Sequence, residues 1–183
     1  MDQATGLMIE PEDCVLAVVD VQERLLPHIH EGDRIVDNIV KLIRFAKIVG
    51  LPILWAEQEK LGATAEAIRE EFGGLEPFGK AHFGCLGCEG FREKLASLGR
   101  STLVLCGIEA HICVAQTALQ ALPRCRVQVV ADAVGSRAPA NREIALERLR
   151  RAGAVVTCVE MFFYEMLQRA GTETFRAVLP LVK

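Results

Sequence analysis

The 183-residue sequence lacks a strong excess of either charge, and this absence narrows the classes of partner. It has 21 lysines and arginines against 24 acidic residues, a formal net charge of −3 and a pI near 5.9. Proteins that bind nucleic acid present a broad cationic field to the phosphates. The arginines at 148–151 are accompanied by Glu143 and Glu147, as on a solvated helix face. We therefore expect no nucleic-acid partner.

Segments that would direct the chain into or across a membrane are also missing. The N-terminal stretch MDQATGLMIEPEDC is acidic and has no basic segment followed by an apolar one, so it does not resemble a secretory signal. No apolar run is long enough to span a bilayer. Seven cysteines, an odd number, without such a signal favour reduced thiols over a disulfide framework. We expect a cytoplasmic protein with no membrane partner.

What the sequence does have is a regular alternation of two hydrophobic patterns. Short β-branched apolar runs alternate with segments whose apolar residues recur every three or four positions, such as Ile35, Ile39 and Ile43. The composition, 51% hydrophobic and 25% charged, suits one domain over residues 1–183. Strands are expected at 15–19, 53–56, 102–106, 127–131 and 154–159, and helices at 33–49, 63–72, 89–98, 110–122 and 141–151.

This alternation predicts the fold class. Apolar strands separated by helices are typical of a parallel sheet covered on both faces. We expect an α/β, doubly wound (Rossmann-like), mainly parallel sheet of about six strands, with one short extended piece in PFGKAHF inside the loop at 73–90. The ligand crevice of such a sheet lies beyond the carboxyl ends of its strands. Candidate functional residues are therefore sought where strands end.

Asp20 ends the first strand, in VVDVQ. A carboxylate at the end of an apolar strand is partly desolvated, which raises its pKa and suits it to proton transfer near neutral pH. An aspartate that caps the following turn explains the position equally well.

Lys80 lies in FGKAHF, between Phe78 and Phe83. A lysine in this setting commonly packs its aliphatic stem and extends its ammonium to water. Beside a cysteine, the same ammonium would stabilise a thiolate and a developing oxyanion.

Cys113 lies in GIEAHICVAQTAL, where an apolar run stops at Gly107 and a helix is expected to begin. Unpaired amides and the helix dipole lower the pKa of a cysteine in a first helical turn. The same amides can hold the oxyanion of a tetrahedral intermediate. A buried filler is the alternative, because cysteine is among the most buried residue types.

These three segments, together with VVADAVGSRAPANREIALERLRRAGAVVTCVEMFFYEML, closely resemble the isochorismatase-like (cysteine hydrolase) superfamily over nearly the whole chain. The resemblance implies a catalytic triad of Asp20, Lys80 and Cys113. It also implies a cis peptide bond between Ile108 and Glu109 and an oxyanion hole formed by the backbone amides of Glu109 and Cys113. The implied reaction is hydrolysis of a C–N bond in a small amide or carbamoyl compound through a thioester.

The sequence also departs from parts of the superfamily. Nicotinamidases bind a metal through histidines in the loop after the second strand, but this loop reads LWAEQEKLGAT, so we expect no metal and no cofactor. Isochorismatases lack the cysteine nucleophile, so Cys113 argues against that reaction. Ala110 stands where a threonine is common, as in an uncharacterised branch. Gln22, Glu57, Gln58 and Phe83 are the candidate substrate-pocket residues.

Two other classes of function stay open. Cys113, or Cys85 and Cys88 in CLGC, could serve a thiol redox protein, and the chain could be a non-catalytic interaction scaffold. His111 precedes Cys113 by two residues and should point to another helix face, so it is not the expected base. The apolar segments MFFYEML and FRAVLPLVK hold more hydrophobic side chains than a small domain needs, so we expect a homo-oligomer, a dimer or larger; part of them belonging to the core is the alternative.

Overall fold

The computed structural model describes residues 8–182; residues 1–7, on which the expectation of no secretory signal partly rests, and Lys183 lie outside the described part. Six parallel strands form one sheet in the order β3-β2-β1-β4-β5-β6. This doubly wound order reverses direction between β1 and β4. The predicted parallel sheet is confirmed. Its strands are β1 (Cys14–Val19), β2 (Ile53–Gln58), β3 (Phe78–Lys80), β4 (Thr102–Ile108), β5 (Arg126–Gly135) and β6 (Val155–Thr157).

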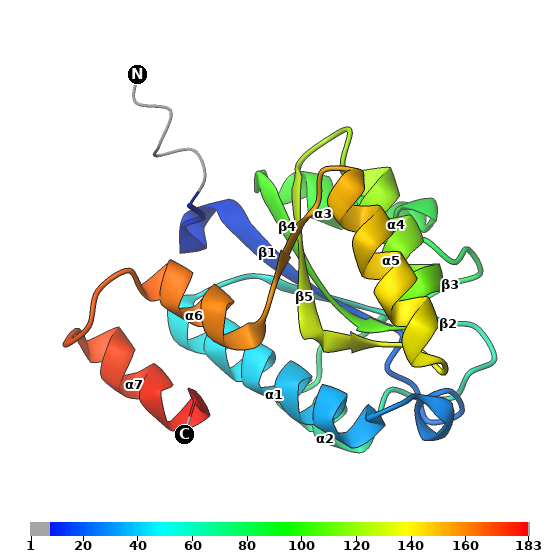
Figure 1. The fold of residues 1–183 in the computed structure, drawn as a ribbon, viewed down its shortest axis with the longest axis horizontal. Coiled ribbons are helices and arrows are strands. Elements are labelled where there is room, and N and C mark those ends of the chain that lie inside the picture. The colour runs from blue at the N-terminus through cyan, green and yellow to red at the C-terminus, as the bar shows by residue number, and fades with distance from the viewer. Residues whose placement is uncertain (1–7, 183) are drawn as a thin grey trace.

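Helices cover both faces of the sheet, as the apolar strands predict (Figure 1). One face carries α1 (Gly32–Val49), α2 (Glu66–Phe72), α6 (Val159–Leu167) and α7 (Glu173–Val182), and the other carries α3 (Glu89–Ser97), α4 (Ala115–Ala121) and α5 (Pro139–Arg151). Short 3-10 turns lie at Pro11–Asp13, Leu26–His28 and Cys85–Gly87. Within residues 8–182, no helix is long and apolar enough to cross a membrane.

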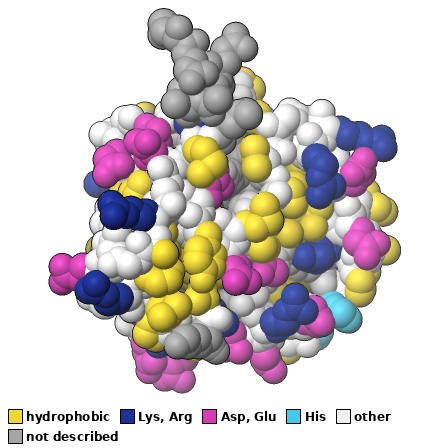
Figure 2. Space-filling model, turned by 60° about the vertical axis from the view of Figure 1, so that its left-hand side comes forward, with side chains coloured by type: hydrophobic (Ala, Val, Ile, Leu, Met, Phe, Trp, Pro, Cys, Tyr) yellow, Lys and Arg dark blue, Asp and Glu magenta, His cyan; other side chains and the backbone are white. Residues whose placement is uncertain are grey.

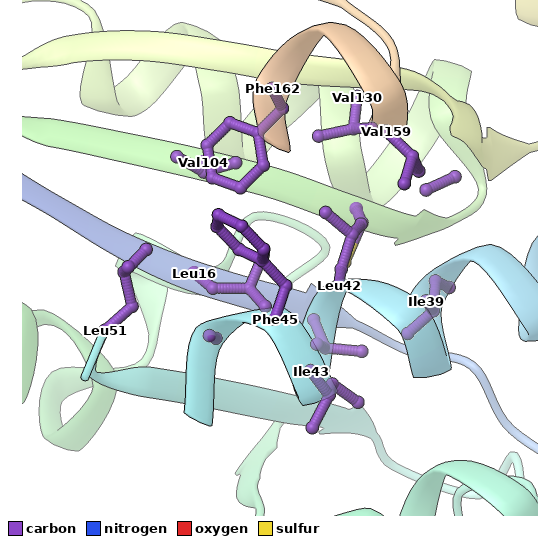
Figure 3. Close-up of a cluster of buried hydrophobic side chains, with 14 of the residues drawn as sticks. Leu16, Ile39, Leu42, Ile43, Phe45, Leu51, Val104, Val130, Val159 and Phe162 are labelled. Atoms are coloured by element: carbon purple, nitrogen blue, oxygen red, sulfur yellow. The ribbon is translucent and has the colours of Figure 1, made fainter. Parts of the chain in front are cut away.

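Alternation along β1 explains the two layers. Leu16 and Val18 belong to the core on the α1 side, whereas Val15 and Ala17 belong to the core on the α4 side. Phe45 of α1 lies between β1 and α6 (Figure 3). Its ring stacks on Phe163 with the ring centroids 4.1 Å apart and meets Phe162 edge-on at 5.7 Å. The sheet is therefore buried on both sides, as its continuous apolar strands require.

The C-terminal part differs most from the sequence prediction. The segment MFFYEML belongs to α6, and its Phe162, Phe163 and Met166 are core residues. Met161 and Tyr164 keep 62% and 43% of their surface exposed. Figure 2 shows hydrophobic side chains gathered on one face of the molecule. Much of the segment that was predicted to drive oligomerisation therefore completes the core, and a smaller exposed part remains.

Gly107 lies at the closest approach of β1 and β4. It pairs with Val19, and its φ is 119°. A Cβ atom added there would lie 2.1 Å from the carbonyl oxygen of Val19, which is backbone and has no room to move. Only glycine fits this position.

Gly107→Ala should therefore lower the free energy of unfolding by roughly 3 kcal/mol or more, measured by urea denaturation. Gly50→Ala is the matched control, because Gly50 also has a positive φ, 74°, but has no neighbouring atom near its added Cβ. The control should cost only about 1 kcal/mol of backbone strain. Equal costs for the two variants would show that the collision at Val19 is relieved easily.

Candidate active site

Asp20 follows the last residue of β1, at the point where the strand order reverses. Its φ is 52°, in the left-handed region, and its side chain is fully buried. The backbone N–H of Asp20 donates to the carbonyl of Ala56 at 3.0 Å, and its carbonyl accepts from the N–H of Gln22 at 2.8 Å. A non-glycine residue in this conformation costs about 1 kcal/mol or more, and such residues concentrate at functional sites. These bonds fix the carboxylate at the carboxyl edge of the sheet.

Lys80 is the last residue of β3 and reaches across the end of β2 to Asp20. Its Nζ donates to Oδ2 of Asp20 at 2.7 Å, and both side chains are fully buried. The ammonium also donates to Oε1 of Gln58 at 2.8 Å, to the carbonyl of Phe83 at 3.0 Å and to that of His82 at 3.2 Å. A buried ammonium needs a counter-ion and further acceptors of this kind. Lys80 is therefore not a solvent-exposed lysine.

Two glutamine side chains hold the surroundings of Lys80. The amide of Gln22 donates to the carbonyls of Gln58 and Gly62, at 3.0 and 2.6 Å, and accepts from the N–H of Gln58 at 2.8 Å. The amide of Gln58 donates to the carbonyl of Ala81 at 2.9 Å while its oxygen accepts from Lys80. Both glutamines were predicted to contact substrate. In the structure their polar atoms tie the loops after β1, β2 and β3 together around the ammonium.

The other two pocket candidates lie on the same edge. One carboxylate oxygen of Glu57 accepts from both the N–H and the hydroxyl of Thr64, each at 2.7 Å. Phe83 is different, because its side chain is 54% exposed although its carbonyl binds Lys80. Among these candidates, Phe83 presents the most side-chain surface to a ligand. A substrate contact by any of them stays a prediction.

Cys113 lies on the neighbouring strand connection, after β4. A π-helical turn, Ala110–Val114, precedes α4, so the helix predicted at 110–122 begins with a wider turn. The peptide bond between Ile108 and Glu109 is cis, as the resemblance implies. The carbonyl of Cys113 accepts from the hydroxyl of Thr117 at 2.7 Å. The Cys113 side chain is 6% exposed and is thus nearly buried.

The sequence argument predicted a lowered pKa for the Cys113 thiol, and this was wrong. Burial raises its pKa strongly, and the carboxylate of Asp20 raises it further, while Lys80 lowers it to a smaller extent. Desolvation disfavours the charged thiolate and is the largest of these effects. In addition, the ammonium that would stabilise a thiolate is bound to Asp20. The resting residue is therefore a protonated thiol.

Asp20 has one oxygen that is suited to accept the thiol proton. Burial raises the pKa of its carboxyl, against the lowering effects of Lys80 and Cys113. Oδ2 is held by Lys80, whereas Oδ1 is buried and has no hydrogen-bond partner of ordinary geometry. A buried carboxylate oxygen without a donor is rare and unfavourable unless it has a function. The Cys113 thiol and the backbone of Gln58 both interact with this carboxyl.

Residues after β5 complete this edge of the sheet. Nδ1 of His111 lies 3.0 Å from the hydroxyl of Ser136. The carboxylate of Glu109 accepts from the backbone N–H of Arg137 at 2.9 Å and from its Nε at 3.1 Å. The sequence prediction missed Ser136 and Arg137, although they follow a strand end in VGSR, which is the signal used for Asp20 and Lys80. The expectation that His111 is not the base stays a prediction.

The remaining cysteines show no paired thiols within residues 8–182. Cys85 is fully buried, and burial raises its pKa to about 12, whereas Cys88 is partly exposed. A thiol that initiates disulfide exchange has a lowered pKa, so this pair does not favour redox chemistry. In the described part of the chain, no group of three His, Cys, Asp or Glu side chains is placed to hold a metal ion.

Comparison with known proteins identifies the family and the fold. A family model described as Isochorismatase domain matches residues 14–161. The secreted isochorismatase effector Isc1 of Phytophthora sojae is 33% identical over 180 residues, which cover 94% of this chain and 86% of that protein. The structure of MAR1 ribonuclease from Caenorhabditis elegans superimposes with a TM-score of 0.89 at 31% identity, covering 96% and 92% of the two chains. The YcaC gene product of Escherichia coli, described as an octameric hydrolase of unknown specificity, has a TM-score of 0.90 at 22% identity and covers 96% and 89%.

Asp20→Asn should make Cys113 more reactive. Removing the carboxylate charge while Lys80 stays positive lowers the thiol pKa, so we expect alkylation by iodoacetamide near neutral pH to accelerate by about tenfold. Peptide mapping by mass spectrometry measures the rate at each cysteine. Fully buried Cys106 reports unfolding, and Asp37→Asn, an exposed change in α1, is the control. Slower alkylation of Cys113 in a folded variant would contradict this electrostatic account.

Proposed function

Because the chain belongs to the isochorismatase family, we propose that it is a cysteine-dependent hydrolase of a C–N bond in a small amide or carbamoyl compound. Family membership supports hydrolysis as the reaction class. The choice of a C–N bond is inferred from the residues of the candidate site. The observation that carries the proposal is that Asp20 meets both other residues: Lys80 donates to its Oδ2, and its carboxyl interacts with the Cys113 thiol. This arrangement suits a base and a nucleophile that act as one unit.

In the proposed first half-reaction, Oδ1 of Asp20 takes the proton of the Cys113 thiol, and Sγ attacks the carbonyl carbon of the substrate. The carbonyl π electrons move to its oxygen, where the amides of Glu109 and Cys113 would stabilise the negative charge. The tetrahedral intermediate then collapses. Asp20 returns its proton to the leaving nitrogen as the C–N bond breaks, and the acyl group stays on sulfur as a thioester.

In the second half-reaction, water attacks the thioester carbon and Asp20 accepts the proton of that water. The C–S bond breaks, the acid product leaves, and the proton on Asp20 returns to the thiolate of Cys113. Lys80 stays positively charged throughout and offsets the negative charge that moves between Asp20, the intermediate and the thiolate. The raised thiol pKa fits this sequence, because a thiolate forms only when the proton has moved to Asp20.

A homo-oligomer and a cytoplasmic location remain proposals. The exposed side chains of Met161, Tyr164 and Ile48 supply apolar surface that a second copy could cover. The Escherichia coli neighbour is described as octameric, and Isc1 is named as a secreted effector. A sedimenting mass equal to one 20.1-kDa chain would argue against the oligomer.

The name of the Caenorhabditis elegans relative raises ribonuclease activity as another substrate class. The formal net charge of −3 does not favour RNA, because phosphate contacts supply much of the affinity for nucleic acid. RNA therefore belongs in the substrate panel as the competing possibility.

Release of ammonia or amine from a panel of small amides, ureides and carbamoyl compounds tests the proposal. Activity should survive a chelator and fall by a factor on the order of 10³ or more in Cys113→Ala, because the nucleophile is lost. Cys158→Ala, at a partly exposed thiol, is the matched control and should keep activity. Amine release that persists in Cys113→Ala would contradict the proposed nucleophile, and cleavage of RNA alone would contradict the proposed substrate class. Loss of activity in Cys88→Ser would favour the thiol redox alternative.

The pH dependence of kcat/KM tests the role of Asp20. Asp20 must be ionised to accept the thiol proton, and burial raises its pKa above the ordinary value of 3.8. Activity should therefore be full at higher pH and fall as the pH decreases through that raised pKa, giving an acid limb with its midpoint above 3.8. Circular dichroism at each pH checks that the chain stays folded. Constant kcat/KM down to pH 3.8 would exclude Asp20 as the base.

A further inference from the structure

A hollow in the surface lies beside α3, toward the opposite edge of the sheet from the candidate active site. Its volume is about 470 Å³, and it lies between α3 and the amino ends of β1 and β4. Apolar side chains form its floor: Val15, Leu86 and Leu103 are buried, and Leu95 and Ala96 of α3 keep exposed surface. Val15 lies at the start of β1 and Asp20 beyond its end, roughly 16 Å of strand apart. The other end of the hollow is nearer the site, because Leu86 follows Phe83, whose carbonyl binds Lys80, by three residues.

Positive charge surrounds this apolar floor. Three arginines, Arg92, Arg100 and Arg124, line the hollow against a single acidic residue, Glu93. The chain as a whole carries a formal net charge of −3. The hollow is therefore a local exception to the acidic balance of the protein, and like charges gathered around one cavity attract an anion.

The hydrogen bonds of these arginines position their side chains without neutralising them. Arg124 donates to the carbonyl of Gln120 at 2.7 Å, and Arg100 donates to the carbonyls of Pro11 and Glu12. A carbonyl oxygen accepts a hydrogen bond but carries no full negative charge. The guanidinium groups are therefore held in place, and these acceptors do not compensate their positive charge.

Arg92 has a weak counter-ion. It donates to the carbonyl of Leu86 at 3.2 Å and lies 3.7 Å from the carboxylate of Glu89, which is 78% exposed. Exposed pairs of this kind contribute little. Elsewhere on the surface the pairing is closer: Glu147 lies 2.7 and 3.1 Å from Arg151 and Arg150. Because the arginines of the hollow have no close carboxylate partner among the described residues, their guanidinium groups are available to bind a ligand.

We propose that this hollow is a binding site for a small amphipathic carboxylate. The apolar body of the ligand would cover Leu95 and Ala96. Its carboxylate would accept from Arg92 and Arg124, because guanidinium groups match carboxylates in geometry. A volume of about 470 Å³ falls within the range of small-molecule sites. The half-buried thiol of Cys125 also lines the hollow and reports its occupancy.

Calorimetric titration with decanoate, kept below its micelle concentration, tests this site. We expect one decanoate per chain, about tenfold weaker binding in Arg92→Gln or Arg124→Gln, and at least about tenfold weaker binding of the neutral 1-decanol. Both arginines are exposed, so the variants should fold; thermal unfolding checks this. Arg148→Gln, at an exposed arginine of α5, is the matched control and should bind as the unmodified chain does.

Alkylation of single cysteines locates the bound decanoate, since the acid could also enter the candidate active site as a product analogue. Protection of Cys125 while Cys113 reacts as before supports the proposal. Three results would overturn it: protection of Cys113 alone, equal affinity for decanoate and 1-decanol, or an affinity for decanoate that is unchanged in both arginine variants. Absence of binding, with an oligomer that dissociates when Arg92 or Arg124 is replaced, would show instead that a second copy covers the hollow.

Discussion

The buried ion pair between Lys80 and Asp20 is the interaction on which the candidate site depends. It joins β3 to β1 across the end of β2, with both side chains fully buried and 2.7 Å between the charged atoms. Removing one partner of such a pair leaves an unpaired buried charge and typically costs 3–5 kcal/mol, roughly half the stability of many domains. The acceptors supplied by Gln58 and by two carbonyls are what make an ammonium tolerable there. The local structure of three loops is therefore organised around one charge.

The same pair controls the reactivity of Cys113. Because the ammonium is bound to Asp20, it offsets only part of the desolvation that raises the thiol pKa. A protonated, nearly buried thiol is less open to oxidation and adventitious alkylation than an exposed thiolate. In the proposed mechanism Asp20 has two separate tasks, because Oδ2 anchors the lysine while the carboxyl also serves as a base. Nucleophile activation would thus depend on a proton transfer within the site rather than on a permanently charged sulfur.

The sequence was informative where short-range rules suffice. Apolar runs and helical periodicity predicted the parallel sheet, and the rule that parallel strands share one edge brought Asp20 and Lys80 together. The sequence prediction was wrong about the pKa of the Cys113 thiol. That pKa depends on how deeply the side chain is buried, which its position in a helical turn does not reveal. The sequence also could not give side-chain partners, so it did not reveal that the amides of Gln22 and Gln58 bind backbone groups; their contact with a substrate stays a prediction. The apolar segment of α6 could equally have been surface, because only tertiary packing decides between core and interface.

Gly107 connects the stability of the fold to the geometry of the site. Its missing side chain allows the backbone of β4 to approach the Val19 carbonyl, at the end of the strand that positions Asp20. Two residues later the chain reaches Glu109, and Cys113 follows in the first turn of the helical segment. Any displacement of β4 at Gly107 would therefore also move Cys113 relative to Asp20, and proton transfer between them depends steeply on that separation. The close backbone contact at Gly107 and the proposed base and nucleophile lie near the same edge of the sheet, so a substitution at Gly107 should damage the fold and the site together.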